Sequence, residues 1–168
     1  DYITRDYGIG ISYKKITVST SGISKMIKKM ADDNVKFNLA VSLHSAIEHT
    51  RNKIMPFSKS FPIKDLVESL EYWYEKTKRR ITFEYLIWNN INDDFNHINA
   101  LVSICKRIPS KINLIEYNSI GNSNFESADE IWINNYLNIL KDNKIPVSTR
   151  RSRGKDIQAA CGQLANKH

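Results

Sequence analysis

The sequence predicts an α/β fold built on a parallel sheet, and three observations carry this prediction. Stretches rich in β-branched and aromatic residues alternate with amphipathic stretches of helical period along the chain. One strand candidate, residues 37–43, is almost continuously apolar, as strands of a parallel sheet are when they are buried. The length of 168 residues suits a single domain, and no repeat, low-complexity tract or linker divides it.

Five segments have the composition of strands. They span residues 15–19, 37–43, 81–87, 111–117 and 146–149. Their alternation with helices predicts parallel βα units with right-handed crossovers. Five strands are too few for a closed eight-stranded barrel, so the pattern fits an open α/β layer or part of a larger barrel.

Helices with one apolar face are expected between these strands. A short one at 48–55 ends before Pro56. The apolar faces of the others are, in chain order, Ile23, Met26, Ile27 and Met30; Leu66, Leu70 and Trp73 (within 62–76); Ile98, Leu101, Val102 and Cys105; and Ile133, Leu137 and Leu140. Residues 92–94 (Asn-Asp-Asp) are expected to cap one helix, and Ser127 with Glu130 has the form of a capping box for another. Cys105 is thereby assigned to the core.

Composition and charge limit the classes of function. The formal net charge of +7 suits a polyanionic partner such as a nucleic acid, although it also occurs on ordinary soluble proteins. No run approaches the roughly 18 apolar residues of a membrane span, and no secretory signal pattern is present. The two cysteines form neither a disulfide framework nor a metal-binding spacing, so we expect no metal ligands in this chain and a reducing, cytoplasmic setting.

Polar residues follow several of the predicted strands. Ser19 lies in the segment Ser19-Thr20-Ser21-Gly22, Ser42 and His44 flank Leu43, and Asn118 follows the fourth strand. Each has a structural explanation as a helix cap, a turn residue or a satisfied rim residue. Because ligands gather at the carboxyl ends of parallel strands, together they predict a small-molecule site.

Glu84 is a carboxylate in the middle of an otherwise apolar strand. A buried carboxylate requires a partner, and an arginine is the expected one. Glu84 belongs either to a ligand pocket or to a structural ion pair, and the ion pair is the favoured interpretation.

The C-terminal stretch combines cations with a lone cysteine. Arg150, Arg151, Arg153 and Lys155 precede Cys161, which stands between two small residues, an alanine and a glycine. Neighbouring cations favour the nucleophilic thiolate, and small neighbours leave the sulfur accessible. The cations alone are equally consistent with a solvated charge run or with contacts to RNA phosphates.

The stretch RRSRGKDIQAACGQL resembles the C-terminal signature of the radical S-adenosylmethionine (SAM) enzymes that methylate carbon 2 of adenine in 23S ribosomal RNA and in tRNA. The resemblance implies that Cys161 is itself methylated and carries the carbon to the RNA. Gln158 stands where the family usually has Asp.

Three further stretches carry the same resemblance. VSTSG, SLH and the strand-four stretch NLIEYNS match SAM-contacting motifs, which implies that Ser19, Ser42, Leu43, His44 and Asn118 bind SAM. The family commonly has NLIPYNP where this chain has NLIEYNS, and SLHAP where it has SLHSA. The lost prolines reduce the rigidity of these loops rather than remove a ligand.

The family also implies the fold, the cofactors and the partners. The fold would be a partial (βα) barrel of the radical SAM type, of which this chain contains the last four or so βα units and a basic tail. The cofactors would be SAM and a 4Fe-4S cluster. The partners would be 23S rRNA and tRNA, with a flavodoxin-type electron donor and no membrane. Arg150, Arg151, Arg153 and Lys155 would contact the RNA.

Several family features are not in this sequence. It lacks a CxxxCxxC motif, so the cluster ligands would lie outside the chain, as would an N-terminal RNA-binding domain. We therefore expect residues 1–168 to be one domain of a longer enzyme and to be inactive alone. Its first strand would be a free sheet edge, through which the chain would self-associate. Two alternatives remain: a related enzyme that methylates carbon 8 of the adenine, and a non-catalytic α/β module that binds RNA or SAM.

Overall fold

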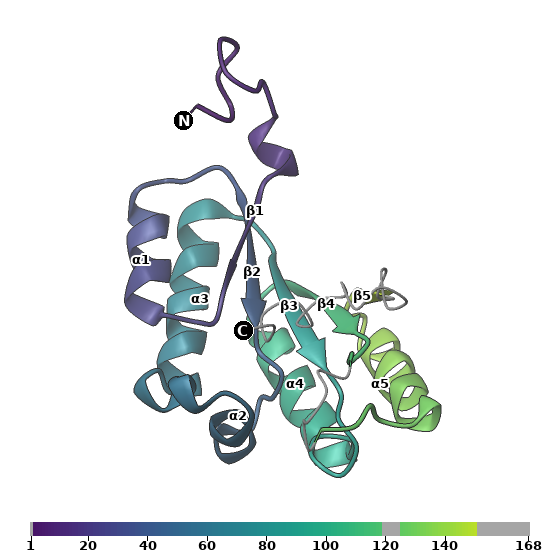
Figure 1. Ribbon diagram of the computed structural model, residues 1–168. Helices are drawn as coiled ribbons and strands as arrows, with labels where there is room; N and C mark the ends of the chain where they lie inside the picture. Colours follow the sequence, from purple (N-terminus) through teal and green to yellow (C-terminus); the bar gives the residue numbers. More distant parts are fainter. Residues whose placement is uncertain (1, 119–124, 151–168) are drawn as a thin grey trace, which may run out of the picture.

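The computed structural model describes residues 2–118 and 125–150, which form one five-stranded parallel sheet (Figure 1). The strands lie in the order in which they occur in the chain, and each pairs in parallel with the next. They are β1 (Thr17–Thr20), β2 (Asn38–Ser42), β3 (Ile81–Leu86), β4 (Ser110–Ile115) and β5 (Val147–Arg150). The predicted parallel α/β architecture is confirmed.

Helices connect the strands, and all of them except the short α2 pack apolar residues against the same face of the sheet (Figure 1). They are α1 (Ser24–Asp32), α2 (Glu48–Ile54), α3 (Ile63–Thr77), α4 (Phe95–Arg107) and α5 (Glu130–Asp142), with short 3₁₀ turns at Tyr13–Lys15 and Pro56–Ser60. Alternate strand residues such as Val41, Phe83 and Leu114 point into the core beneath these helices. The intervening residues of each strand therefore point to the opposite face, which we call the inner face.

The predicted apolar faces of α3 and α4 are confirmed. The whole α4 stripe, including Cys105, is buried, and so is the α3 stripe, where Trp73 stacks on Phe37 at a ring separation of 6.4 Å. Burial raises the pKa of the Cys105 thiol to about 11, so this cysteine stays protonated and apolar in character.

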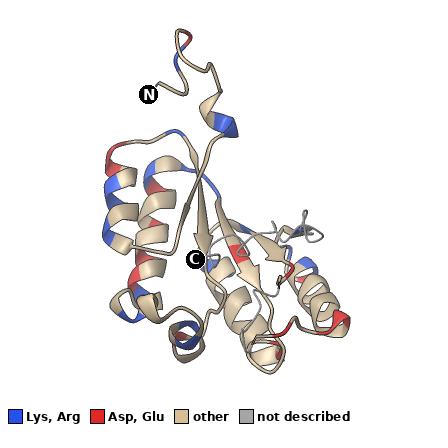
Figure 2. Ribbon diagram, viewed as in Figure 1, with Lys and Arg blue, Asp and Glu red and all other residues tan. Residues whose placement is uncertain are grey.

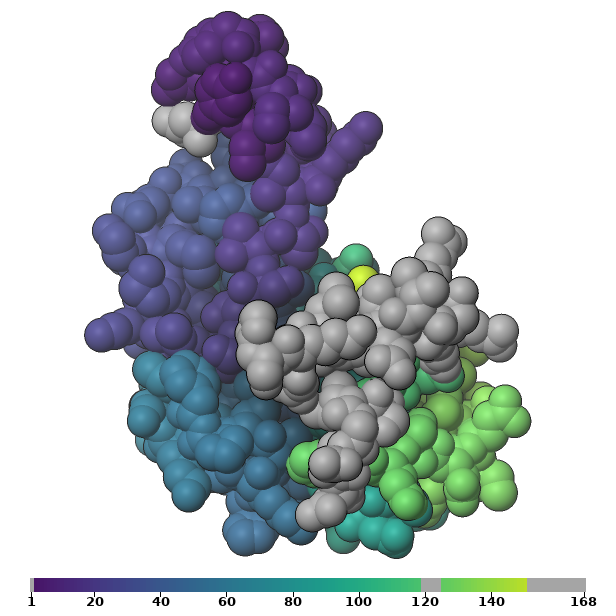
Figure 3. All heavy atoms as spheres, in the orientation of Figure 1, coloured from purple at the N-terminus to yellow at the C-terminus, as the bar shows by residue number. Residues whose placement is uncertain are grey.

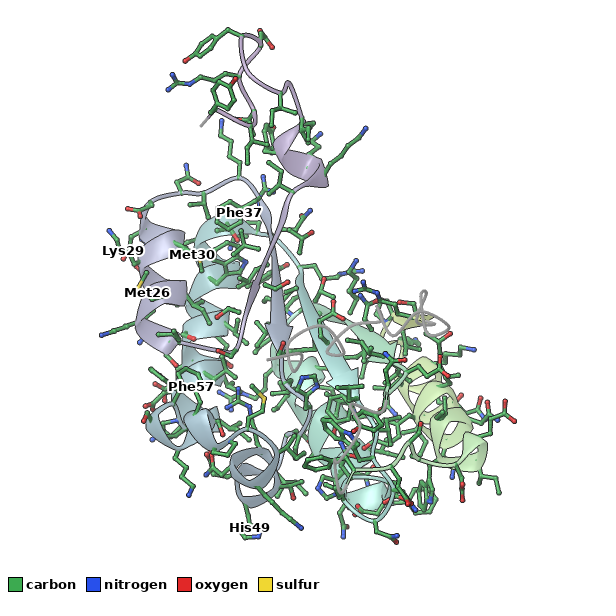
Figure 4. All side chains as sticks on the ribbon, in the orientation of Figure 1. Met26, Lys29, Met30, Phe37, His49 and Phe57 are labelled. Carbon is green, nitrogen blue, oxygen red and sulfur yellow. The ribbon has the colours of Figure 1, made fainter. Side chains whose placement is uncertain are left out.

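The prediction for α1 is wrong in one position. Met26 is 44% exposed, whereas Ile27 is fully buried and Met30 is partly buried; Figure 4 labels both methionines. The buried face of α1 continues through Ala31, because a helix this close to α3 turns only a narrow stripe inward.

Two boundary predictions are also corrected. The first strand begins at Thr17 rather than Lys15, because Lys15 closes the 3₁₀ turn before it. The capping box is wrong: Asp129 is the N-cap of α5 and makes no side-chain cap bond. Ser127 instead forms a bridge with Trp88, which holds the chain extended before the helix. The cap at Asp94 is confirmed, since its side chain accepts a hydrogen bond from the His97 amide.

The segment before β1 projects from the body of the molecule (Figures 1 and 3). It carries exposed apolar side chains, including Tyr2, Tyr7 and Ile9. Lys and Arg are spread over the outer helices and this segment rather than gathered on one face of the described part (Figure 2). Among the described residues, no helix is both long enough and apolar enough to cross a membrane.

Candidate functional site

The inner face of the sheet carries a row of polar side chains. Strand pairing sets Ser42 beside Glu84, Glu84 beside Asn113, and Asn113 beside Ser148. We call these four residues the inner row. Ser19 on β1 points to the same face, one row nearer to the amino ends of the strands. Two of the SAM contacts implied by the resemblance, Ser19 and Ser42, are thus brought to one face.

Hydrogen bonds link three residues of the inner row. Ser148 Oγ donates to Asn113 Oδ1 over 2.6 Å, and Asn113 Nδ2 donates to Glu84 Oε1 over 3.0 Å. Glu84 Oε2 is buried and receives no hydrogen bond from the described residues. The arginine expected as the partner of Glu84 is wrong: within the described ranges no ion pair includes Glu84, because the strand register sets the Asn113 amide opposite it.

The end of β2 turns sharply at the SLH stretch. The Leu43 amide donates to the Glu84 carbonyl (3.1 Å), and the Leu43 carbonyl accepts from the Ser45 amide (2.7 Å). His44, between them, adopts φ of 56°, a left-handed conformation that non-glycine residues rarely hold. The Leu43 side chain lies in the core. A cofactor contact from Leu43 would therefore come from its backbone, whereas Ser42 offers its side chain.

The His44 ring is fixed in one tautomer. Its Nδ1 accepts a hydrogen bond from the Leu86 amide (3.2 Å), so the proton of the neutral ring sits on Nε2. Burial, and secondarily the charge of Arg51, lower the pKa of His44 to about 4. The ring also meets Trp88 edge-on at 5.6 Å. Near neutral pH, His44 is a neutral hydrogen-bond donor through Nε2. His49, which Figure 4 labels on α2, is exposed to solvent and takes no part in this arrangement.

Asn92 holds the His44 turn in place and was interpreted from the sequence only as part of a helix cap. Its fully buried side-chain amide donates to the carbonyls of His44 (2.7 Å) and Leu86 (2.8 Å), and its oxygen accepts from the Trp88 amide (2.7 Å). Its backbone carbonyl accepts from the Tyr136 hydroxyl (2.6 Å). Asn92 therefore joins the ends of β2 and β3 to α5.

Arg51 is the second residue that the sequence did not single out. Its side chain is fully buried, and Nη2 donates to the Ser21 carbonyl (2.7 Å) in the turn after β1. Gly22, with φ of 101°, lets this turn approach, because a Cβ there would lie 3.1 Å from Nη2. Burial lowers the pKa of Arg51, and nearby Glu48 opposes that shift. Arg51 thus ties α2 to the turn that follows Ser19.

The remaining predicted site residues divide into two groups. Asn118 is buried beyond the end of β4, and its side-chain amide contacts the Glu116 carbonyl at 3.4 Å. The ring of its neighbour Tyr117 packs edge-on against Trp88, and Trp88 packs edge-on against His44. This segment therefore lies at the same carboxyl edge of the sheet as the SLH turn. Arg150 ends β5 and is exposed. Four residues lie outside the described part of the chain: Cys161, Arg151, Arg153 and Lys155.

A cavity of about 650 Å³ lies between β4, β5 and α5. Its walls include Leu114, which points to the helix side of β4, and Ile133 and Leu137 of α5, with Arg150 also lining it. It does not coincide with the inner row. The described ranges contain no group of three or more His, Cys, Asp or Glu residues that could hold a metal ion.

Known proteins resemble this chain along nearly its whole length. It is 61% identical over 167 residues to the probable dual-specificity RNA methyltransferases RlmN of Flavobacterium psychrophilum and Flavobacterium johnsoniae. It is 37% identical over 166 residues to the protein of the same name from Clostridium tetani. These matches cover 99% of this chain and 48% of each relative, so the chain spans about half the length of the curated relatives it matches. No family model matches the chain.

Solved structures agree with the fold. A radical SAM methyltransferase from Sphaerobacter thermophilus superposes with a TM-score of 0.91 at 33% identity, over 96% of this chain and 47% of that one. A domain of pyruvate-formate lyase-activating enzyme from Bacteroides vulgatus gives 0.62 at 14% identity, with 80% of each chain covered. Streptococcus suis SuiB bound to SAM gives 0.58 at 10% identity, over 85% of this chain and 32% of that one. The five parallel strands and their helices are part of a radical SAM-type barrel.

Proposed function

We propose that the chain, which resembles the RlmN dual-specificity RNA methyltransferases along nearly its whole length, is the C-terminal part of a radical SAM enzyme of that family that methylates carbon 2 of adenine in 23S rRNA and tRNA. The observation that carries the proposal is the 61% identity over 167 residues to relatives named as dual-specificity RNA methyltransferases. The intact enzyme would be cytoplasmic, and its N-terminal RNA-binding domain and its cluster-binding strands would lie outside these 168 residues.

In this proposal SAM lies over the carboxyl edge of the inner face. Ser19 and Ser42 present hydroxyls there, and His44 presents an Nε2–H donor fixed by the Leu86 amide. Leu43 contributes through its backbone, and Asn118 reaches the same edge. The donor set fits an uncharged polar ligand surface such as that of a nucleoside, and the buried free oxygen of Glu84 adds an acceptor. SAM supplies the methyl group and the radical chemistry of the reaction.

Cys161 is the proposed acceptor of the methyl group within the protein. Its sulfur carries the carbon before the carbon passes to the adenine ring, and the neighbouring cations favour the thiolate that this role requires. Arg150, Arg151, Arg153 and Lys155 hold RNA phosphates and so bring the target nucleotide to that sulfur. A base attacked within folded RNA is turned out of its stack, which requires such backbone anchors.

The 4Fe-4S cluster draws its ligands from outside this chain. Three clustered thiolates are required, and the chain has two cysteines, of which Cys105 is buried beneath the sheet on the side away from the inner face. A flavodoxin-type protein would supply electrons. Within the described part β1 pairs only with β2, and Thr17 and Ser19 are exposed. This free edge would receive a neighbouring strand of the whole enzyme, and in the isolated chain it would drive self-association.

Mass spectrometry of the protein from its native cell tests the proposal. Trypsin should release the peptide Asp156–Lys167, and Cys161 in that peptide should carry an extra methyl group. Analysis of the modified RNA should then find 2-methyladenine, whereas 8-methyladenine would identify the related carbon-8 enzyme instead. An unmethylated Cys161, together with RNA that carries neither product, would leave only a non-catalytic module that binds RNA or SAM and would refute the proposed activity.

A further inference from the structure

The Glu84 side chain lies on the inner face of the sheet, and only one of its two carboxylate oxygens is hydrogen-bonded to a described residue. Oε1 accepts a hydrogen bond from Asn113 Nδ2 (3.0 Å), and Asn113 is itself oriented by Ser148 Oγ (2.6 Å). Oε2 is buried without any hydrogen-bond partner. A buried carboxylate oxygen with no partner is costly, and the usual resolution is a donor from a ligand, a cation or water.

The described structure supplies no cation for this oxygen. Its ion pairs join Lys29 to Asp33, His97 to Asp94 and Arg107 to Glu71. None of these pairs includes a residue of β3. Glu84 is therefore not explained by the structural ion pair that its strand position suggested. Asn113, which is neutral, orients the carboxylate without neutralising it.

The strand register sets the neighbours of Glu84 on the inner face. In one neighbouring row of the inner face the paired residues are Ser19, Ala40, Thr82 and Lys111, of which the first three have small side chains. The row on the other side contains Leu86, Ile115 and Arg150. Ser42, one strand from Glu84, lies roughly 4.8 Å away across the sheet, the ordinary spacing of paired strands. Ser42 and Glu84 are thus neighbours on the inner face, beside a row whose side chains are small except for Lys111.

We propose that Glu84 Oε2 accepts a hydrogen bond from a ribose hydroxyl of an adenosine moiety bound on the inner face. Acidic residues at the carboxyl ends of parallel strands accept ribose hydroxyls in other nucleotide-binding sheets, because a carboxylate is a pure acceptor and a hydroxyl a ready donor. The assignment rests on the proposed function. Two sources carry this chemistry there: SAM, and the target adenosine of the RNA.

The test uses the full-length enzyme with its cluster reconstituted. Glu84→Gln keeps the acceptor for Asn113 and turns the free oxygen into an amide donor, so it changes the ribose contact with little change in shape. Glu68→Gln, on the exposed face of α3, removes the same charge and is the matched control. Equilibrium dialysis would measure the dissociation constants of SAM and of its 2′-deoxy and 3′-deoxy analogues.

If the ribose belongs to SAM, Glu84→Gln should weaken SAM binding by roughly 10- to 100-fold, as the loss of a hydrogen bond to a charged group does. The wild type should prefer SAM to one deoxy analogue, and the variant should lose this preference, while Glu68→Gln behaves as wild type. If the ribose belongs to the RNA, the same pattern should appear with an RNA hairpin that carries a 2′-deoxyadenosine at the target position. Either pattern supports the proposal.

The wild-type arm keeps the proposal testable even where Glu84→Gln does not fold. Wild-type enzyme that binds SAM and the hairpin normally, but binds all deoxy forms equally well, would overturn the role of Glu84 and leave the proposed function intact. Wild-type enzyme with no measurable affinity for SAM would overturn both.

Discussion

Replacement of Asn92 by alanine should destabilise the fold and loosen the His44 turn together. The Asn92 side chain is fully buried and makes three hydrogen bonds, to the carbonyls of His44 and Leu86 and from the Trp88 amide. At about 1 kcal/mol for each hydrogen bond, Asn92→Ala should lower the free energy of unfolding by roughly 3 kcal/mol. The variant would also leave the Trp88 amide buried without an acceptor, so the loss of stability should not be much smaller than this.

Urea denaturation of the chain, followed by tryptophan fluorescence, would measure this loss. Asn99→Ala, at an exposed position of α4, is the matched control and should change the free energy of unfolding by less than about 0.5 kcal/mol. NMR of the His44 ring would report the turn directly. A loss below about 1 kcal/mol for Asn92→Ala, or an unchanged His44 signal, would refute the role given to this amide.

The pH dependence of the stability of Asn92→Asp tests whether the side chain at this position acts as a hydrogen-bond donor. The new carboxyl would face the two carbonyl acceptors of His44 and Leu86, so only its protonated form can donate to either, and its folded-state pKa should rise above the unfolded value. Its stability should therefore be greatest at low pH and should fall as the pH rises above about 4. Stability that rises over this range would contradict the donor role.

Three other changes test the neighbouring turn and the buried histidine. The pKa of His44 is about 4 in the folded state and 6.5 in the unfolded state, so the unfolded state binds the proton first as the pH drops. The free energy of unfolding should therefore fall by up to roughly 1.4 kcal/mol per pH unit between pH 6.5 and about 4. His44→Gln should flatten this part of the pH profile, measured by urea denaturation. Arg51→Met removes the charge that helps to lower the pKa of His44 and breaks the hydrogen bond to the Ser21 carbonyl. An NMR titration should therefore find a higher pKa for His44. An unchanged pKa would rule out the electrostatic effect of Arg51 on His44. Gly22→Ala places a side chain at a left-handed φ of 101° and a Cβ 3.2 Å from the Leu66 methyls. Thermal melts should therefore indicate that the free energy of unfolding falls by about 1–3 kcal/mol. An unchanged stability would show that the turn relaxes.

The fold was predictable because it is encoded in short-range patterns. The strand at 37–43 and the α4 stripe are visible as local runs of apolar residues with periods of two or 3.6, and both are confirmed. The errors occur where a distant partner overrides the local pattern. Ser127 has the form of a helix cap, yet its backbone pairs with Trp88 across the chain and the helix begins later.

The site was only partly predictable for the same reason. Ser42 and His44 were named through a family resemblance, and the structure sets them at the sheet edge where the alternation of strands and helices would also lead one to look. Asn92 and Arg51 carry no comparable signal, since their partners lie 48 and 30 positions away in the sequence. Glu84 was noticed as an anomaly, but only the strand register identifies Asn113 as its partner.

The contacts among the described residues indicate how the proposed SAM site would keep its shape. Ser19 lies next to the last residue of β1, and His44 lies in the turn after β2. A buried side chain from another element fixes each strand end: Arg51 holds the turn after β1, and Asn92 holds the turn after β2. Both bonds end on backbone carbonyls, so they fix the path of the chain without using the Ser19 hydroxyl or His44 Nε2, the groups that we propose contact SAM. A site built in this way should tolerate changes in the loop sequence, such as the glutamate, the serine and the alanine that stand here where the resembling family has prolines, because rigidity would come from beneath the loops rather than from within them. Loss of Arg51 or Asn92 should therefore harm ligand binding more than substitution within the loops themselves.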